Sequence, residues 1–228
     1  MTANTVIRLQ PHIPNSFMLQ KYFFIVNYFV IIAFAIFFYK KYAHSTPLKL
    51  FLYFLIYSFL TEVTGTYFSF VLKKPTFFIY HTWIILSLYF YGLFFLSRIK
   101  NIKARAVIKG LLAFYLIYTI INISFFKDFA SQSLIDNIII GRILIVIFVL
   151  LYFSELLNSD AILNIKKSLF FWISIGVLFY NIGFIPVYVI GEYISFRGAF
   201  RYIAFGLNII MGACFISGFL MSKKQYNI

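Results

Sequence analysis

Seven nearly uncharged apolar runs, each about 20 residues long, constrain the fold of this chain more than any other feature. A helix needs about 20 apolar residues to cross the hydrocarbon core of a bilayer. The runs lack the polar face of a soluble helix and the alternation of a transmembrane β-strand. We therefore predict an all-α integral membrane protein, a seven-transmembrane-helix bundle. Its spans lie at approximately 22–39, 50–72, 76–96, 106–126, 138–156, 168–190 and 200–221.

The composition of the 228-residue chain agrees with lipid as its surroundings. Hydrophobic residues make up 63% of it and charged residues 11%, against about 45–50% and about 25% in soluble domains. The connections between runs are short, which predicts one transmembrane domain over 1–228 and no soluble domain. Residues 33–35 (Ala-Phe-Ala) are similar to a signal-peptidase site, but the apolar run continues through them, so we expect the first span to be retained.

Basic residues are unevenly divided between the two sets of connections. One set, at 40–49, 97–109, 166–167 and 223–224, carries twelve Lys and Arg, and the other set carries seven. Because cytoplasmic connections are enriched in Lys and Arg, we predict an outside N-terminus and a cytoplasmic C-terminus in a bacterial inner membrane. The same rule accounts for the net charge of +14, and we expect no nucleic-acid partner.

Glu62 is the most unusual residue of the spans because it is the only charge in the run 50–72. A carboxylate near the bilayer centre costs roughly 3 kcal/mol on insertion scales. Small and polar residues share its helix face, at Ser58, Gly65, Thr66 and Ser69. Such a stripe is typical of a face turned into the bundle. Glu62 then either hydrogen-bonds a neighbouring helix or lies in a wet cavity where it meets a ligand or ion.

Further polar residues in the spans extend this candidate site. The predicted ligand- or ion-binding set is Glu62, His81, Arg142, Asn181, Arg201 and Asn208. Arg142 either snorkels to the headgroups or turns inward as the counter-ion of Glu62. His81 is either an interfacial histidine without a ligand or part of the site, and both asparagines are either interhelical glue or site residues. Their depths predict a pocket that opens to the outside, with Glu62 at its floor.

Motifs of common membrane proteins are missing. The last run has no lysine for a retinal Schiff base, and the chain has no His-Glu-x-x-His, Walker or Gly-x-Gly-x-x-Gly motif. No serine stands in the context that a rhomboid-like protease needs. The one cysteine, Cys214, and three separated histidines do not form a metal-ligand cluster. We therefore predict no enzyme activity, no cofactor and no metal.

The layout resembles, in architecture alone, the seven-helix sensory regions fused to bacterial signalling proteins such as histidine kinases. This resemblance extends over the whole chain and implies a receptor-like function by analogy of fold. Because little sequence follows the last run, we expect any kinase to be a separate protein.

Together these features predict a small seven-helix inner-membrane receptor-like or accessory protein with an outward-facing polar pocket above Glu62, which signals or acts through a partner. One alternative is a proton- or cation-coupled transporter with Glu62 as the coupling site and a helix broken near Asn181, Gly183 and Pro186. Another is a structural or assembly subunit of a membrane complex. Expected partners are membrane lipid and a protein that contacts the basic loop Arg98–Lys109, and the sequence also allows a homo-oligomer.

Overall fold

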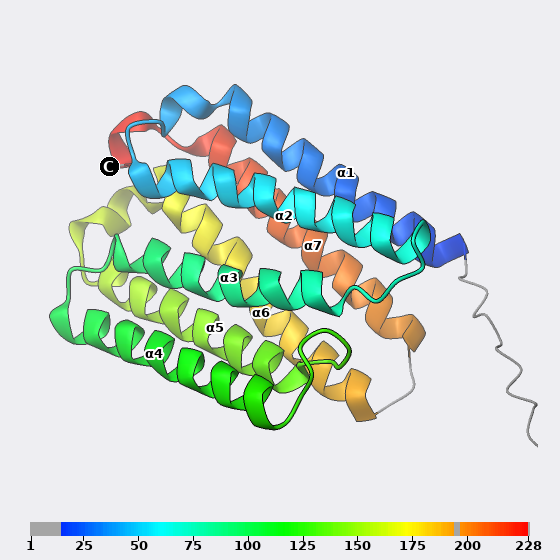
Figure 1. Ribbon diagram of the computed structural model, residues 1–228. Coiled ribbons are helices and arrows are strands. Elements are labelled where there is room, and N and C mark those ends of the chain that lie inside the picture. The colour runs from blue at the N-terminus through cyan, green and yellow to red at the C-terminus, as the bar shows by residue number, and fades with distance from the viewer. Residues whose placement is uncertain (1–14, 194–196, 228) are drawn as a thin grey trace, which may run out of the picture.

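The protein is described by a computed structural model that covers residues 15–193 and 197–227, with side chains at 22–159, 162–190 and 202–227. Long helices make up nearly all of this part of the chain (Figure 1). They are α1 (Asn15–Phe37), α2 (Thr46–Phe70), α3 (Phe77–Leu96), α4 (Ile102–Phe125), α5 (Ile135–Leu157), α6 (Leu169–Tyr193) and α7 (Arg197–Met221). Short 3₁₀ helices lie at Tyr39–Lys41, Asp160–Lys167 and Lys224–Tyr226.

Within the described residues, six helices are long and apolar enough to cross a membrane. These are α2 to α5 over their full lengths, Leu169–Ile190 of α6 and Tyr202–Met221 of α7. The described apolar part of α1, Tyr22–Phe37, is shorter. The prediction of an all-helical membrane protein is therefore confirmed, with six candidate spans by length and composition.

The helix bounds differ from the predicted spans mainly at the polar ends. Helix α2 begins at Thr46, four residues before the apolar run, and Pro47 occupies its first turn, where the missing N–H is not needed. Helix α4 begins at Ile102, because the Asn101 side chain accepts hydrogen bonds from the first-turn N–H groups. Lys103, Arg105 and Lys109 therefore stand on helix α4 rather than in a loop.

Six helices form a ring and α4 packs outside it. Helix α1 packs against α2 and α7, α2 against α3, α3 against α5, α5 against α6, and α6 against α7. Helix α4 contacts the outer sides of α3 and α5 and lies at the edge of the bundle in Figure 1. The ring contains α1, so this helix is an integral part of the fold.

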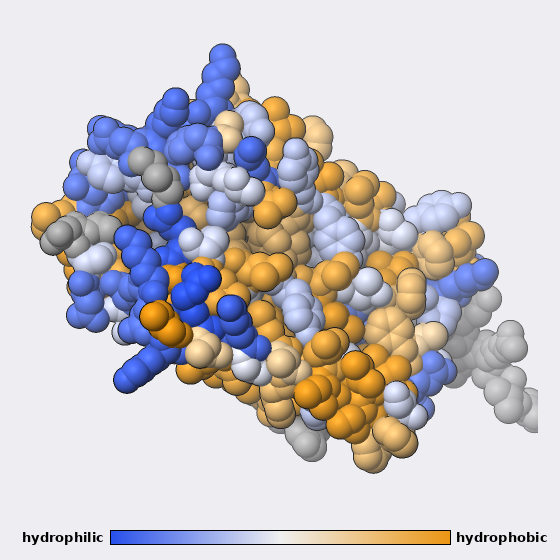
Figure 2. Space-filling model, turned by 60° about the vertical axis from the view of Figure 1, so that its left-hand side comes forward, coloured by the Kyte–Doolittle hydropathy of each residue, from blue (hydrophilic) through white to orange (hydrophobic). Residues whose placement is uncertain are grey.

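One end of the bundle, which we call the basic end, contains the connections 38–45, 97–101 and 158–168 and the segment 222–227. Hydrophilic side chains gather there, and hydrophobic ones cover the flank that Figure 2 shows. The Lys41 ammonium donates to the carbonyl oxygens of Phe219 and Leu220 at the end of α7. Buried Asn227 accepts from the Leu169 N–H and donates to the Lys41 carbonyl, so the last described residues join α6 to the 3₁₀ helix that follows α1.

Stacked aromatic side chains fill the interior between the basic end and the middle of the bundle. The rings of Phe54 and Phe90 lie 4.2 Å apart and nearly parallel, and those of Phe94 and Phe170 lie 4.7 Å apart. Phe51 contacts Phe215 edge-on at 5.1 Å. Aromatic pairs of this geometry add about 0.5–1.5 kcal/mol each beyond their burial. This aromatic layer, formed by the residues just named, closes the ring toward the basic end.

Helix α6 runs continuously from Leu169 to Tyr193 although Pro186 lies inside it. Proline is tolerated in membrane helices where neighbouring groups satisfy the freed backbone carbonyl. A Cβ atom on Gly183 would overlap a Leu207 methyl group, so this glycine allows close packing of α6 on α7. The helix break that the transporter interpretation expected near these residues is not present, because Pro186 is accommodated within the helix.

Candidate functional site

A cavity of about 360 Å³ lies inside the ring, toward the end opposite the basic end. Thr76 and Ser133, from the connections at that end, line its mouth. The other lining residues come from α1 (Phe24, Tyr28), α2 (Glu62), α3 (Phe77, Tyr80, His81, Trp83, Ile84), α5 (Ile138, Arg142), α6 (Tyr180, Phe184, Tyr188) and α7 (Ala204, Asn208). Each ring helix contributes to the wall, and α4 supplies none of these described lining residues. The volume falls near the lower limit for small-molecule sites.

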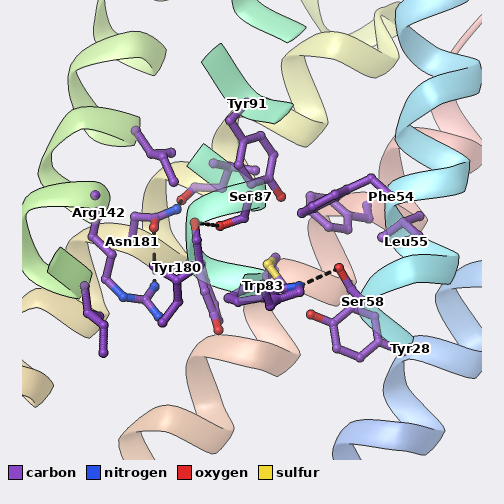
Figure 3. A pocket seen from close by; sticks show the side chains of 17 residues that line it. Tyr28, Phe54, Leu55, Ser58, Trp83, Ser87, Tyr91, Arg142, Tyr180 and Asn181 are labelled. Atoms are coloured by element: carbon purple, nitrogen blue, oxygen red, sulfur yellow. Dashed lines mark hydrogen bonds between the residues drawn. The ribbon is translucent and has the colours of Figure 1, made fainter. Parts of the chain in front are cut away.

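A second, narrower chamber of about 30 Å³ continues the cavity toward the aromatic layer. Tyr28, Trp83, Ile84, Ile138, Arg142 and Tyr180 line both chambers. In this deeper chamber the Trp83 indole N–H donates to the Ser58 hydroxyl over 3.0 Å (Figure 3). The space is sufficient for one or two water molecules. Arg142 thus stands where the wide chamber meets the narrow one.

Arg142 is a buried cation, with 6% of its surface exposed. Its guanidinium carbon lies 5.1, 4.6 and 5.1 Å from the ring centres of Tyr180, Phe184 and Tyr188. Such cation–π contacts stabilise a desolvated cation by about 2 kcal/mol or more. The Nε atom is buried without a hydrogen-bond partner in the described part of the chain. Of the two alternatives stated for Arg142, the structure shows the inward-facing one.

Asn181 holds the guanidinium in place. Its amide nitrogen donates to the Val177 carbonyl one helical turn earlier, over 2.8 Å. This bond orients the amide so that its oxygen accepts from Arg142 Nη1 over 3.3 Å, as Figure 3 shows. Asn181 belongs to the wall of the narrow chamber. Two residues of the predicted set therefore meet, one from α5 and one from α6.

Glu62 lies half-buried on the α2 wall of the wide chamber. The Tyr80 hydroxyl donates to its Oε2 atom over 3.2 Å. Gly65 makes this contact sterically feasible, because a Cβ atom there would lie 2.5 Å from the Tyr80 oxygen. Of the small and polar residues predicted to share its helix face, Ser58, Gly65 and Thr66 are buried and Ser69 is half-buried.

The ion pair that the sequence suggested between Glu62 and Arg142 is not formed in this structure. Helix α3 separates α2 from α5 in the ring, so the two side chains approach the cavity from different walls. Arg142 is held by Asn181 and three aromatic rings of α6, whereas Glu62 is held by Tyr80 of α3. Tyr180 lies within electrostatic range of both. The cavity therefore contains two opposite charges on separate walls.

His81 lines the cavity, but both of its ring nitrogens contact backbone groups of the connection 126–134. The Leu134 N–H donates to Nε2 over 3.2 Å, which leaves Nδ1 to donate to the Phe129 carbonyl over 3.0 Å. These partners define a neutral imidazole with its proton on Nδ1. Phe77 and Phe129 contact the same ring. In this arrangement His81 positions the connection that borders the cavity mouth.

The connection 126–134 is also ordered from within. The Ser131 hydroxyl and the Ala130 N–H donate to the Asp128 carboxylate and hold its pKa below the ordinary value. At the surface Lys127 pairs with Asp136 over 2.7 Å. Exposed ion pairs of this kind contribute about 0–1 kcal/mol. The mouth is therefore bounded by a structured segment.

Asn208 of α7 is buried and lines the wide chamber. Its side-chain amide nitrogen donates to the Ala204 carbonyl. Its backbone carbonyl accepts from the side-chain amide of Asn27, on α1, over 3.2 Å. Asn208 therefore lies both on the cavity wall and in a contact between α1 and α7. The side chain of Arg201, the remaining member of the predicted set, lies outside the described residues.

The aromatic wall was not recognised as part of the site from the sequence. Tyr80 and Trp83 of α3 line the cavity, and Tyr28, Tyr180 and Tyr188 join them. Their spacing carries a weak signal, because Tyr180, Phe184 and Tyr188 repeat every four residues on one helix face. With 32 Phe and 18 Tyr in the chain, such repeats are too common to single out.

The described cavity wall combines charged, hydrogen-bonding and apolar groups. Among the described residues no group of three or more His, Cys, Asp or Glu side chains could hold a metal ion. Arg142 and Glu62 supply charge, the tyrosines and Asn208 supply hydrogen-bonding groups, and Trp83, Phe24 and Phe184 supply apolar surface. Comparison with protein-family models, curated proteins and solved structures found no match to this chain.

Proposed function

We propose that this protein is a seven-helix receptor-like protein of the bacterial inner membrane, which binds a small molecule in the cavity between Glu62 and Arg142 and acts through a partner protein. The observation that carries the proposal is the cavity itself, with two opposite charges on separate walls inside a membrane-type bundle. Ionisable groups retained inside a membrane protein generally mark a functional site. In this proposal α1 also crosses the membrane and brings the six candidate spans to seven.

The proposed orientation places the cavity mouth outside and the basic end in the cytoplasm. Lys and Arg dominate the connections of the basic end, which is the arrangement of a cytoplasmic surface. Two of the five basic residues in Arg98–Lys109 have internal roles: Arg105 donates to the Leu96 and Ile99 carbonyls, and Arg98 lies over the Phe170 ring. Lys100, Lys103 and Lys109 are exposed and form the surface offered to a partner or to anionic lipid.

The closed aromatic layer favours a receptor over the transporter alternative. A transporter must open its site to both sides in turn, usually around discontinuous helices. Here α6 is continuous, and stacked rings fill the interior between the narrow chamber and the basic end. Uptake of a bound compound into proteoliposomes, if it required Glu62, would nevertheless establish transport and contradict the receptor proposal.

Fluorescence of Trp83 provides a direct test of ligand binding in the cavity. The chain has two tryptophans, and Trp172 lies near the basic end, where its indole donates to the Lys166 carbonyl. In the Trp172→Phe protein, reconstituted in lipid nanodiscs, emission reports on the cavity alone. A diverse library of small polar compounds should contain members that shift Trp83 emission saturably and raise Tm.

The variants Glu62→Gln and Asp136→Asn form a matched pair for this screen. Both remove one carboxylate, but Asp136 lies at the surface in its pair with Lys127, outside the cavity lining. Compounds that bind the cavity should lose affinity by about tenfold or more in Glu62→Gln and retain it in Asp136→Asn. The proposed function is wrong if no compound shifts Trp83 emission, or if Glu62→Gln and Asp136→Asn change the affinity for the compounds to the same extent.

A further inference from the structure

We propose that Arg142 anchors a binding site for a small organic monoanion, a carboxylate with a compact apolar body. This inference rests on the proposed function, because it names the ligand class of the same cavity. It is carried by the geometry of one buried guanidinium, its surroundings and the charges of the cavity wall. None of these depends on the identity of a partner protein.

The charge of Arg142 cannot be removed by deprotonation. The guanidinium keeps its proton in proteins, so burial leaves a permanent cation in the wall of the cavity. Within the described part of the chain Arg142 forms no ion pair, and its Nε–H has no acceptor. Arg142 Nη1 donates to a neutral amide oxygen, that of Asn181, which carries no charge to balance the guanidinium. An anion in the cavity would supply the missing acceptor and the missing charge together.

The guanidinium is also held ready for such a ligand. Asn181 is oriented by its bond to Val177, and the rings of Tyr180, Phe184 and Tyr188 surround the cation. A preorganised guanidinium loses little side-chain entropy when it binds an anion, which favours affinity. Because Arg142 lines both chambers, a carboxylate bound to it would occupy their junction.

The remaining wall limits the ligand to one negative charge and an apolar body. Among the described lining residues Arg142 is the one cationic side chain, since His81 is neutral. Glu62 faces the same space and would repel a second anionic group. Phe24, Ile84 and Ile138 add apolar surface, and a cavity of about 360 Å³ admits a small body. Benzoate has these properties and serves as the probe.

The test measures benzoate binding by Trp83 emission in the Trp172→Phe protein, in nanodiscs of phosphatidylcholine. Benzamide, which has the same shape without the charge, is the ligand control. Potassium chloride at equal ionic strength tests for a simple halide site, and nanodiscs that contain phosphatidylglycerol test for a lipid headgroup as the occupant. We expect benzoate to bind at least about tenfold more tightly than benzamide, as loss of a charged hydrogen bond predicts.

Three variants locate the anion. Arg142→Gln removes the cation, and Asn181→Asp places a carboxylate at the position from which the amide oxygen now accepts from Arg142. Both substitutions should lower the affinity for benzoate by about tenfold or more and leave the affinity for benzamide unchanged. Lys127→Gln removes a surface cation at the same end of the bundle and should change benzoate affinity less than about twofold.

If Arg142→Gln fails to fold, Asn181→Asp and the benzamide comparison still decide the question. Equal binding of benzoate and benzamide, or unchanged benzoate affinity in Asn181→Asp, would overturn the anion site and leave the proposed receptor function standing. Full competition by chloride or by phosphatidylglycerol would overturn the assignment of an organic carboxylate. Absence of any Trp83 response in the wider library would overturn the receptor proposal itself.

Discussion

His81 contacts two backbone groups of a neighbouring connection, and at the scale of single residues this makes its role testable. In His81→Phe the ring still packs between Phe77 and Phe129, but the Leu134 N–H loses its acceptor. An unsatisfied buried N–H costs about 1–3 kcal/mol. We expect faster hydrogen exchange at Leu134 and a lower Tm.

The neighbouring variant Thr82→Val is the control, because the Thr82 hydroxyl donates only to Phe78 of its own helix and is solvent- or lipid-exposed. Its hydrogen exchange across 126–134 should match that of the unaltered protein. Unchanged exchange at Leu134 in His81→Phe would show that the imidazole does not hold the connection, and would return His81 to the list of candidate ligand-binding residues.

For single side chains, the sequence predicted whether a residue faces the bundle interior better than it predicted which residue it contacts there. The cost of burying a charge in lipid predicted an inward-facing Glu62 and admitted an inward-facing Arg142, and both line the cavity. The sequence could not predict that Arg142 would contact Asn181 rather than Glu62. Helix rotation and the order of helices around the ring decide that, and neither follows from the spacing along one helix.

At the scale of helices, the packing of α6 on α7 depends on glycine. A Cβ atom on Gly218 of α7 would lie 2.7 Å from the Trp172 Cβ and 2.8 Å from a Leu169 methyl. Since the Trp172 Cβ is fixed to the backbone, Gly218→Ala must push the helices apart. We expect a loss of about 1–3 kcal/mol, measured as a lower midpoint of unfolding in denaturing detergent.

Gly206 provides the matched control within the same helix. A Cβ atom there meets nothing within 4 Å, so Gly206→Ala adds a methyl group in open space. Its unfolding midpoint should stay the same or rise, because alanine restricts the unfolded chain more than glycine. Equal effects of the two substitutions would contradict the close approach of α6 and α7.

Helix existence was readily predicted, and helix ends were not. Every apolar run lies within a described helix or overlaps one, because lipid exposure demands internal backbone hydrogen bonding. The start of α4 was missed because its first turn carries Lys103 and Arg105, which precede the apolar run 106–126. The Asn101 cap, a local signal at that position, marks the true beginning.

At the scale of the whole molecule, the proposed orientation can be tested with single cysteines. Cys214 is the one native cysteine, so Cys214→Ser offers a blank background. In that background Asp128→Cys lies at the cavity end and Gln225→Cys at the basic end. A membrane-impermeant maleimide on intact cells should label position 128 and spare position 225 until the membrane is opened. The reverse pattern would invert the orientation and place the cavity mouth in the cytoplasm.

Sequence alone determined that this chain forms apolar helices in a membrane, because each run is long enough and lacks the polar face that water requires. It also determined which spans contain polar residues that need an interior environment. Only the tertiary structure decided that α4 lies outside the ring, that aromatic side chains close the basic end, and that Glu62 and Arg142 face one cavity from separate walls. These features depend on which faces of different helices meet, and that information lies in contacts between residues far apart along the chain.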